Sequence, residues 1–408
     1  MDGTDDRILT QRLDAVRTKL ATHGHDALIV YARGSSAAFG SKSHGYMRYL
    51  CDWDTYYSPG VILIVTPEGP PAFITSDIFL QKLTQELRPH DTIIFSPLPA
   101  LAETVHSVLR EREKSPGRPI RSIACLGRAE APAPFWEGFA AGLAPGAGVH
   151  DFEPHLAEDL AVKDAAQYAL HQKAAAICDG MFAELDRLVP AGLSEWHLRT
   201  ALEKTAKDAG CEHVLIWTAV GPVTKTLHFY REDSTRVPQQ GDQVLCGIYA
   251  LYRGHWGHGI RMGSFAKPTD AMLRGYDAVL AMEEAGIAAL QPGQNLYGVN
   301  DAMEEVFNRL YPGPRDDIFR FRTAHGLGHF SEDPLTTDPF QQPYFPGQSM
   351  ASPENAVLEI REGMLLELHP NVFQRGVTGA AIGDMVYVGP NGPELMLKFP
   401  REFRRWGE

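Results

Sequence analysis

Two patterns of apolar positions distinguish helices from strands in the first part of the chain. Leu9, Leu13, Val16 and Leu20 recur at helical spacing, so residues 9–22 are predicted to form an amphipathic helix. Short apolar runs bounded by turn residues instead predict buried strands. These runs occupy residues 26–31, 60–65, 71–75, 92–95 and 121–126. With a further helix predicted at 100–113, the alternation indicates an α/β domain.

The second part of the chain begins with long helical patterns. A helix is predicted over 164–188, and another begins after Ser194, whose hydroxyl can cap it. The pattern then becomes strand-like, with two helical segments between the strands. The strands are expected at 214–217, 244–249 and 364–368, and the helices at 270–290 and 296–311. This change places a boundary near residue 160, which gives domains 1–160 and 161–408.

Composition narrows the class of protein. The chain has 408 residues, is 44% hydrophobic, and carries a net charge of 38 − 51 = −13. The apolar content predicts a folded protein, and the negative charge disfavours binding to nucleic acid or to an anionic membrane surface. Five scattered cysteines without a CxxC pair indicate neither a disulfide framework nor a cysteine zinc site. We expect a cytoplasmic protein whose partner is a small molecule.

Histidines gather in the second half of the chain, often beside glycines. Glycine lets the backbone approach a ligand closely, and imidazole titrates near neutral pH. A cluster of this kind is more indicative of a site than any single histidine. Its members are His213, His228, His255, His258, His325, His329 and His369.

Short segments along the chain follow one another in a specific order. They are residues 12–14, 26–30, 190–195, His228 ahead of 241–244, 259–261, 324–328, 362–370 and 382–384. In this order they resemble the pita-bread family of creatinase, prolidase, aminopeptidase P and methionine aminopeptidase. The resemblance covers nearly the whole chain. It implies a creatinase-type α/β N-terminal domain, a C-terminal α+β pita-bread domain, and a homodimer.

The peptidases of this family hold two metal ions on two aspartates, one histidine and two glutamates. At the matching positions this chain keeps only the histidine, since the five are Gly247, His258, His325, His369 and Gly383. Carboxylates are the bridging ligands of such a metal pair. We therefore predict that this chain does not form the dinuclear site and lacks ordinary metallopeptidase activity.

The first hypothesis is a metal-free hydrolase like creatinase, with no cofactor. It would cleave a C–N bond of an amide, amidino compound, ureide or lactam. The resemblance makes His228 the general acid and base, because imidazole can take a proton from water and return it to a leaving nitrogen. His325 and Glu332 are the other predicted catalytic residues. An anionic substrate is expected to contact His258, His369, Arg261, Arg322, Tyr249 and Trp217.

The N-terminal domain contributes candidates of its own. In the creatinase branch, the segment that contains Arg48 and Trp53 can reach the active site of a neighbouring subunit. The resemblance therefore implies that these two side chains close the substrate site across a dimer. A plain surface loop is the alternative for this segment.

Two other hypotheses remain open. His258, His325 and His369 could converge on a single Zn or Fe ion in a hydrolase or lyase, with Asp384 or Glu367 as a supporting carboxylate. Alternatively, the domain is a non-catalytic module that binds peptides or proteins. The replacement of ligands by histidines, rather than by mixed small apolar residues, favours a rebuilt polar site.

Overall fold

The computed structural model describes residues 6–33, 42–53, 60–87, 91–114, 117–223, 235–313, 315–321, 323–331 and 358–407. The chain divides into two compact units, Met1–Ala157 and Glu158–Glu408. The division falls within helix α6 (Glu153–Ala161), which also contains the expected boundary at residue 160. Within the described residues, no helix combines the length and apolar character that a membrane span requires.

The N-terminal unit is built on one mixed sheet in the order β4-β3-β2-β1-β5-β6. Strand β1 pairs antiparallel with β2 and parallel with β5. Every residue of β1 and β2 is buried, as expected for strands covered on both faces. The strands are β1 (Ala27–Ala32), β2 (Val61–Val65), β3 (Ala72–Thr75), β4 (Thr92–Phe95), β5 (Ser122–Leu126) and β6 (Gly148–Asp151).

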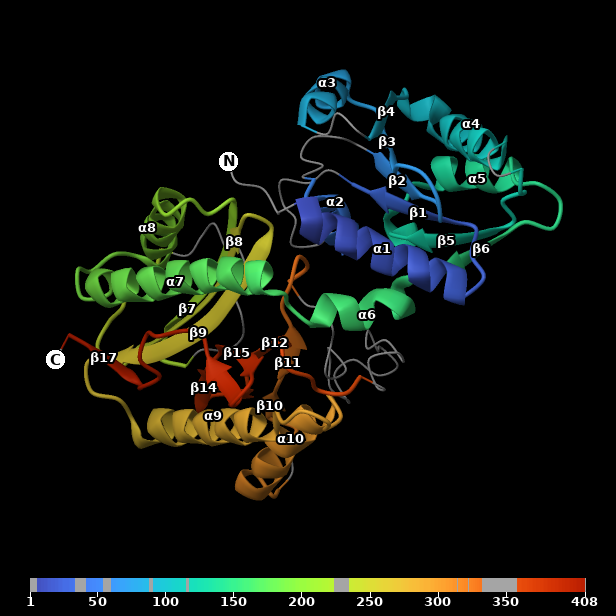
Figure 1. Cartoon of the computed structure of the whole chain (residues 1–408). Helices are drawn as coiled ribbons and strands as arrows, with labels where there is room; N and C mark the ends of the chain where they lie inside the picture. Colours follow the sequence, from blue (N-terminus) through green and yellow to red (C-terminus); the bar gives the residue numbers. More distant parts are fainter. Residues whose placement is uncertain are drawn as a thin grey trace. The chain divides into compact units, whose positions relative to one another are not determined.

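Helices cover both faces of this sheet (Figure 1). Helices α4 (Leu101–Lys114) and α5 (Ala133–Ala141) share an apolar cluster with one face, to which Ile29 and Ile62 contribute. Helix α1 (Asp6–Thr22) buries the predicted stripe of Leu9, Leu13, Val16 and Leu20. Helices α2 (Lys42–Cys51) and α3 (Ile78–Leu87) were not predicted.

In the C-terminal unit, a four-stranded sheet has the order β17-β9-β8-β7. Helices α7 (Ala165–Leu188) and α8 (Glu195–Asp208) pack against it, and Asp164 and Ser194 cap them. Asp164 accepts from the Gln167 backbone while the Gln167 side chain accepts in return, which is a capping box. The strands are β7 (His213–Gly221), β8 (Gln243–Tyr252), β9 (His255–Phe265) and β17 (Arg404–Trp406).

Two smaller sheets complete this unit, with orders β11-β12-β15-β16 and β10-β13-β14. Helix α9 (Asp270–Ala289) packs on β14 and on α10 (Gly298–Leu310). In Figure 1, sheets of this unit lie between α7 and α9. The strands are β10 (Ile318–Phe319), β11 (Ala324–Gly326), β12 (Leu365–Leu368), β13 (Asn371–Gln374), β14 (Thr378–Ala381), β15 (Asp384–Gly389) and β16 (Gly392–Leu395).

Glycines allow the layers of this unit to approach one another. A Cβ on Gly257 of β9 would lie 2.7 Å from the Ala174 carbonyl carbon in α7. The contact is with helix backbone, so no flexible side chain can move aside. Gly180, in the same helix, has open space around its Cβ position. The close packing of α7 on β9 therefore depends on Gly257 and not on Gly180.

Gly257→Ala should lower the free energy of unfolding by about 1–3 kcal/mol, because the added methyl group overpacks the α7–β9 contact. The matched variant Gly180→Ala should raise it by about 0.5–1 kcal/mol, since alanine favours helix at an unhindered position. Urea denaturation followed by circular dichroism measures both. Equal midpoints for the two variants would contradict the packing argument.

Candidate functional site

Strand pairing brings the predicted site residues of the C-terminal unit together. Tyr249 of β8 is the cross-strand partner of His258 in β9, so the two side chains share a face. His325 of β11 is the partner of Glu367 in β12, and His369 follows Glu367 by the two-residue period of a strand. An antiparallel bridge between Ile260 and Gly383 joins the two sheets beside these residues.

The three histidines that replace or retain family ligands form one cluster, which we call the histidine site (His258, His325 and His369). The ring centroid of His258 lies 5.6 Å from that of His325 and 5.7 Å from that of His369, and the last two are 4.9 Å apart. Tyr249 stacks on His258 at 3.5 Å, and its Oη lies 3.5 Å from Nε2 of His325. All four side chains are buried. The structure thus brings together the imidazoles that the sequence singled out.

The first lost carboxylate position, Gly247, is filled by an aromatic ring. Trp217 is the cross-strand partner of Gly247, and a Cβ on Gly247 would overlap the six-membered ring of its indole. Trp217 is almost fully buried. An aspartate at 247 would therefore have no room unless Trp217 moved away.

The last lost carboxylate position, Gly383, is filled by a different acid. A Cβ on Gly383 would overlap Oε1 of Glu367 and would lie 2.9 Å from Cγ1 of Ile260. The Glu367 carboxyl group therefore occupies space that a side chain at 383 would need. It also lies near the histidine site, with Oε1 3.5 Å from Nδ1 of His258.

The residues present do not fit the dinuclear metal site of the family peptidases. Two of the five ligand positions are glycines with filled surroundings, and two others carry imidazole in place of carboxylate. Bridging a metal pair requires the carboxylates that are missing. Among the residues that the structure describes, no group of three or more His, Cys, Asp and Glu side chains is arranged for a metal ion.

The prediction that Arg261 binds substrate is wrong, because the protein itself uses this side chain. Arg261 is buried, and all five of its N–H donors reach protein acceptors. The acceptors are Oδ1 of Asp384 at 2.8 Å and the carbonyl oxygens of Ile260, Gly383, Phe399 and Pro400 at 2.7–3.1 Å. Arg261 is a structural residue that holds β9, β15 and the C-terminal segment together.

A second arginine extends this buried ionic network. Arg401 bonds to Glu283 of α9 at 2.5 Å and lies 3.3 Å from Oδ2 of Asp384. Burial, followed by the nearby Asp384 carboxylate, raises the pKa of Glu283 to about 8. Burial also raises the pKa of Asp384. Asp384 and Glu283 are therefore engaged with arginines that hold the fold.

The other predicted site residues divide into two groups. His228, Arg322 and Glu332 lie outside the described residues. Arg48 and Trp53 belong to the N-terminal unit, where both side chains are buried and the Trp53 ring meets Phe73 edge-on at 5.6 Å. Arg48 lies on helix α2, so the loop alternative is wrong for its part of the segment. The role of both residues in a neighbouring subunit stays a prediction.

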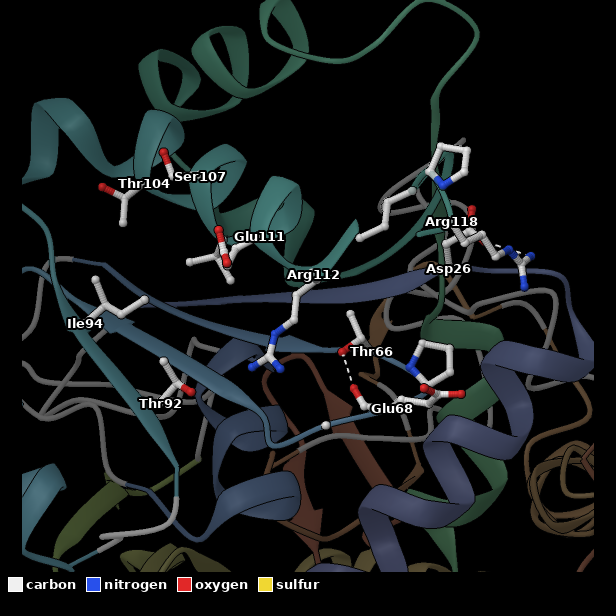
Figure 2. A pocket seen from close by; sticks show the side chains of 15 residues that line it. Asp26, Thr66, Glu68, Thr92, Ile94, Thr104, Ser107, Glu111, Arg112 and Arg118 are labelled. Carbon is white, nitrogen blue, oxygen red and sulfur yellow. Dashed lines mark hydrogen bonds and ion pairs between the residues drawn. The ribbon is translucent and has the colours of Figure 1, made fainter. Parts of the chain in front are cut away.

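A cavity of about 760 Å³ lies in the N-terminal unit, between α4 and the turn that follows β2 (Figure 2). Its polar side chains mostly hold the local backbone. Asp26 pairs with Arg118 at 2.9 Å and accepts from the backbone of Arg121 and Ser122, and Arg112 bonds to the Pro70 carbonyl. These contacts stabilise turns and do not form a catalytic arrangement.

A family model described as metallopeptidase family M24 matches residues 169–390. The match covers more than half of the chain and spans the histidine site. The protein therefore belongs to metallopeptidase family M24.

Individual relatives agree with this assignment. The chain is 25% identical over 434 residues to the agropine synthesis cyclase of Rhizobium rhizogenes, and the match covers 98% of both proteins. It is 22% identical over 241 residues to the uncharacterized peptidase YqhT of Bacillus subtilis (strain 168), covering 59% of this chain and 63% of that protein.

Solved structures show the same fold. A prolidase from Thermococcus sibiricus matches with a TM-score of 0.76 and 19% identity, over 99% of both chains. An X-Pro aminopeptidase from Thermotoga maritima MSB8 matches with a TM-score of 0.71 and 17% identity, over 94% of this chain and 98% of that one. The predicted architecture, an α/β N-terminal domain followed by a pita-bread domain, is confirmed.

The structure contains a second histidine group, which we call the turn cluster (His171, His255 and His329). The sequence placed His255 and His329 among the gathered histidines but gave no sign of His171 or of this grouping. It surrounds the β8–β9 turn, where Arg253 and Gly254 both have positive φ. Each Nδ1 bonds to a carbonyl oxygen of this region, at 2.8–2.9 Å. A carbonyl can only accept, so each Nδ1 carries its proton in these bonds. The position of His171 along the helical pattern of α7 does not predict its hydrogen bond to the Trp256 carbonyl oxygen.

His171 of the turn cluster is held as a neutral imidazole. Burial, followed by the charges of His255 and Lys163, lowers the pKa of His171 well below its usual 6.5. The Gln167 amide lies 3.4 Å from Nε2 of His329. The Oε1 atom of the same amide accepts a hydrogen bond from the Asp164 backbone N–H group. This bond orients the Gln167 amide so that its N–H group faces Nε2 of His329. The folded protein therefore disfavours protonation of His171, whereas the same side chain in the unfolded chain takes up a proton readily.

Stability should fall as the pH drops below 6.5, because the unfolded chain then binds a proton at His171 that the folded protein excludes. His171→Asn keeps a donor near Nδ1 but cannot titrate. It should reduce the acid slope of the unfolding free energy by up to about 1.4 kcal/mol per pH unit. Urea titrations between neutral and mildly acidic pH measure this slope. His197→Asn, on the exposed face of α8, is the control, and equal slopes in all three proteins would refute the prediction.

Proposed function

We propose that the protein is an enzyme that cleaves a C–N bond of a small molecule without a metal, with His228 as general acid and base. The observation that carries this proposal is the filling of two family carboxylate positions. Trp217 fills the space at Gly247, and Glu367 fills the space at Gly383. A side chain that has taken over a ligand's space supports a rebuilt site better than a decayed one.

The chemistry follows from the imidazoles. Neutral His228 takes a proton from water as the water oxygen bonds to the carbonyl or amidino carbon. The resulting imidazolium returns that proton to the nitrogen as the C–N bond breaks, so the histidine ends as it began. Donors from His258, His325 or His369 would stabilise the negative charge that develops on the substrate oxygen. The buried position of these three rings supports this role, because hydrogen bonds strengthen where water is excluded.

The substrate class remains an amide, amidino compound, ureide or lactam. The expectation of an anionic substrate loses one of its supports, since Arg261 is fully engaged within the protein. It now rests on the imidazoles and on Arg322. The Tyr249 ring, which stacks on His258, adds an aromatic wall to the histidine site and favours a substrate with a planar or apolar portion.

A second candidate is ring closure or ring opening on the same kind of carbonyl group. The full-length similarity to a protein named as a cyclase favours it. In ring closure, a nucleophile within the substrate takes the place of water, and the general base removes its proton in the same way. A panel of small amides, ureides, lactams and lactones, followed by mass spectrometry, separates the two. Hydrolysis adds the mass of one water, and cyclisation by condensation removes it.

The other hypotheses are weaker. The relatives are named as peptidases and a cyclase, which are enzymes, so a purely binding module is disfavoured. A single Zn or Fe ion on His258, His325 and His369 is the remaining alternative. The proximity of their rings favours it, although the side chains that the structure describes are not arranged around a common metal position. The homodimer and the cytoplasmic location stay predictions.

Metal analysis tests the metal-free proposal. Protein purified without added metal should contain far less than one equivalent of any transition metal, and a chelator should leave turnover unchanged. Mass-spectrometric metal analysis and an assay with and without chelator provide the measurement. One equivalent of zinc or iron, with activity that chelation removes and that metal restores, would establish the single-metal alternative.

His228→Ala should reduce turnover by roughly 10²–10⁴-fold, which is the usual contribution of a general acid and base. Its unfolding midpoint and circular dichroism spectrum should match those of the unchanged protein. The assay uses whichever compound of the panel is turned over. His150→Ala, an exposed substitution in the N-terminal unit, is the control. Full activity in His228→Ala would remove His228 from the mechanism.

A further inference from the structure

Glu367 is an acid in an unusual place. It lies on β12, directly opposite His325, and its side chain is fully buried. Among the described residues, neither of its carboxyl oxygens has a hydrogen-bond partner. A buried polar group without a partner costs folding free energy, so its presence calls for a function.

The position of this acid depends on Gly383. Any side chain at 383 would overlap Oε1 of Glu367, as the Cβ position alone already does. Ile260 closes the other side of this space, with its backbone nitrogen 3.0 Å from the same Cβ position. Gly383 and Glu367 therefore form a unit in which the glycine provides the space and the glutamate fills it.

The polar neighbour of the carboxyl group within the histidine site is His258, whose Nδ1 is 3.5 Å from Oε1. This separation is a few tenths of an ångström longer than an ordinary N–H···O hydrogen bond, which is about 2.9 Å. The opposite face of the same imidazole is covered by the Tyr249 ring, at a centroid distance of 3.5 Å. Stacking keeps the plane of the ring, so the orientations that remain are related by a turn of about 180° about the Cβ–Cγ bond, and polar contacts decide between them.

We propose that Glu367 is a positioning residue, which accepts a hydrogen bond from Nδ1 of His258 and so directs Nε2 of that ring toward the substrate. This role rests on the proposed function, in which His258 contacts the substrate. A carboxyl oxygen can accept this bond whether or not the acid is ionised, so the proposal does not depend on the charge of Glu367. A partner on one ring nitrogen determines which tautomer the histidine adopts.

The surroundings of Glu367 agree with a specialised role. Burial, followed by the Asp384 and Glu283 carboxylates, raises the pKa of Glu367 well above its usual value. Asp384 is already bonded to Arg261, and Glu283 to Arg401. Glu367 is thus the buried acid of this group that is directed at an imidazole rather than at an arginine.

Nuclear magnetic resonance of protein labelled with ¹⁵N in its histidines tests this proposal without a substrate. The His258 signals are identified by their absence in His258→Gln. In the unchanged protein, His258 should show one tautomer with the proton on Nδ1. Glu367→Leu should give a mixture of tautomers, and Glu367→Gln, which keeps an acceptor oxygen, should restore the single one. An unchanged His258 spectrum in Glu367→Leu would overturn the proposal.

A pair of glycine variants tests the same point without altering Glu367. Gly383→Ala should displace the carboxyl group and reproduce the tautomer mixture of Glu367→Leu. Gly389→Ala, in the strand β15 that follows Gly383, is the matched control, because its Cβ position overlaps the carboxyl group of Glu394 instead. If both alanine variants leave His258 unchanged, or both change it equally, the assignment fails.

Activity measurements then link the positioning role to turnover. With a substrate from the panel, Glu367→Leu should lower kcat on the order of 10²-fold with little change in KM, as expected when a reacting group loses its orientation. Glu367→Gln should recover most of this loss. A changed tautomer with unchanged kcat would retain the contact but refute the link to turnover. Because the tautomer is measured without substrate, this outcome is distinct from failure of the metal-free mechanism.

Discussion

The C-terminal unit depends on one close contact, where Ile260 of β9 meets Gly383, the residue before β15. The two residues exchange backbone hydrogen bonds of 3.1 Å in both directions. Arg261 reinforces this junction with bonds to both of their carbonyl oxygens and to Asp384. Removing a partner from such a buried network leaves charge without compensation, so the network resists change. The histidines on either side of the junction keep their relative positions for the same reason.

The sequence predicted the elements better than it predicted their uses. Regular apolar patterns located α1, α7, strands β1–β5 and strands β7, β8 and β12 to within a few residues, because burial requires those patterns. Helices α2, α3, α5 and α6 were missed, and so were β6 and several strands of the C-terminal unit, among them β13, β14 and β16. Arg261 was misassigned because a sequence does not reveal that carbonyl oxygens from distant segments surround a guanidinium group. His171 and the grouping of the turn cluster were missed for a related reason, since the partners of these rings are backbone atoms.

The candidate site was foreseen in part. His258, His325 and His369 were chosen by their positions in the family motifs, and the fold does bring their rings together. Glu367 was considered only as support for a metal, although its spacing of two residues from His369 on a strand placed both on one face. Trp217 was expected to contact substrate. Its overlap with the space at Gly247 depends on the pairing of two strands, which residue types alone do not determine.

The filled space at the two glycines has a consequence for how this chain can change over time. Restoring an aspartate at 247 requires a smaller residue at 217, and restoring a glutamate at 383 requires the withdrawal of Glu367. Each reversion made alone introduces a steric clash in the core of the unit. A carboxylate-rich metal centre at these positions therefore requires paired changes, one at each glycine and one at the side chain that fills its space.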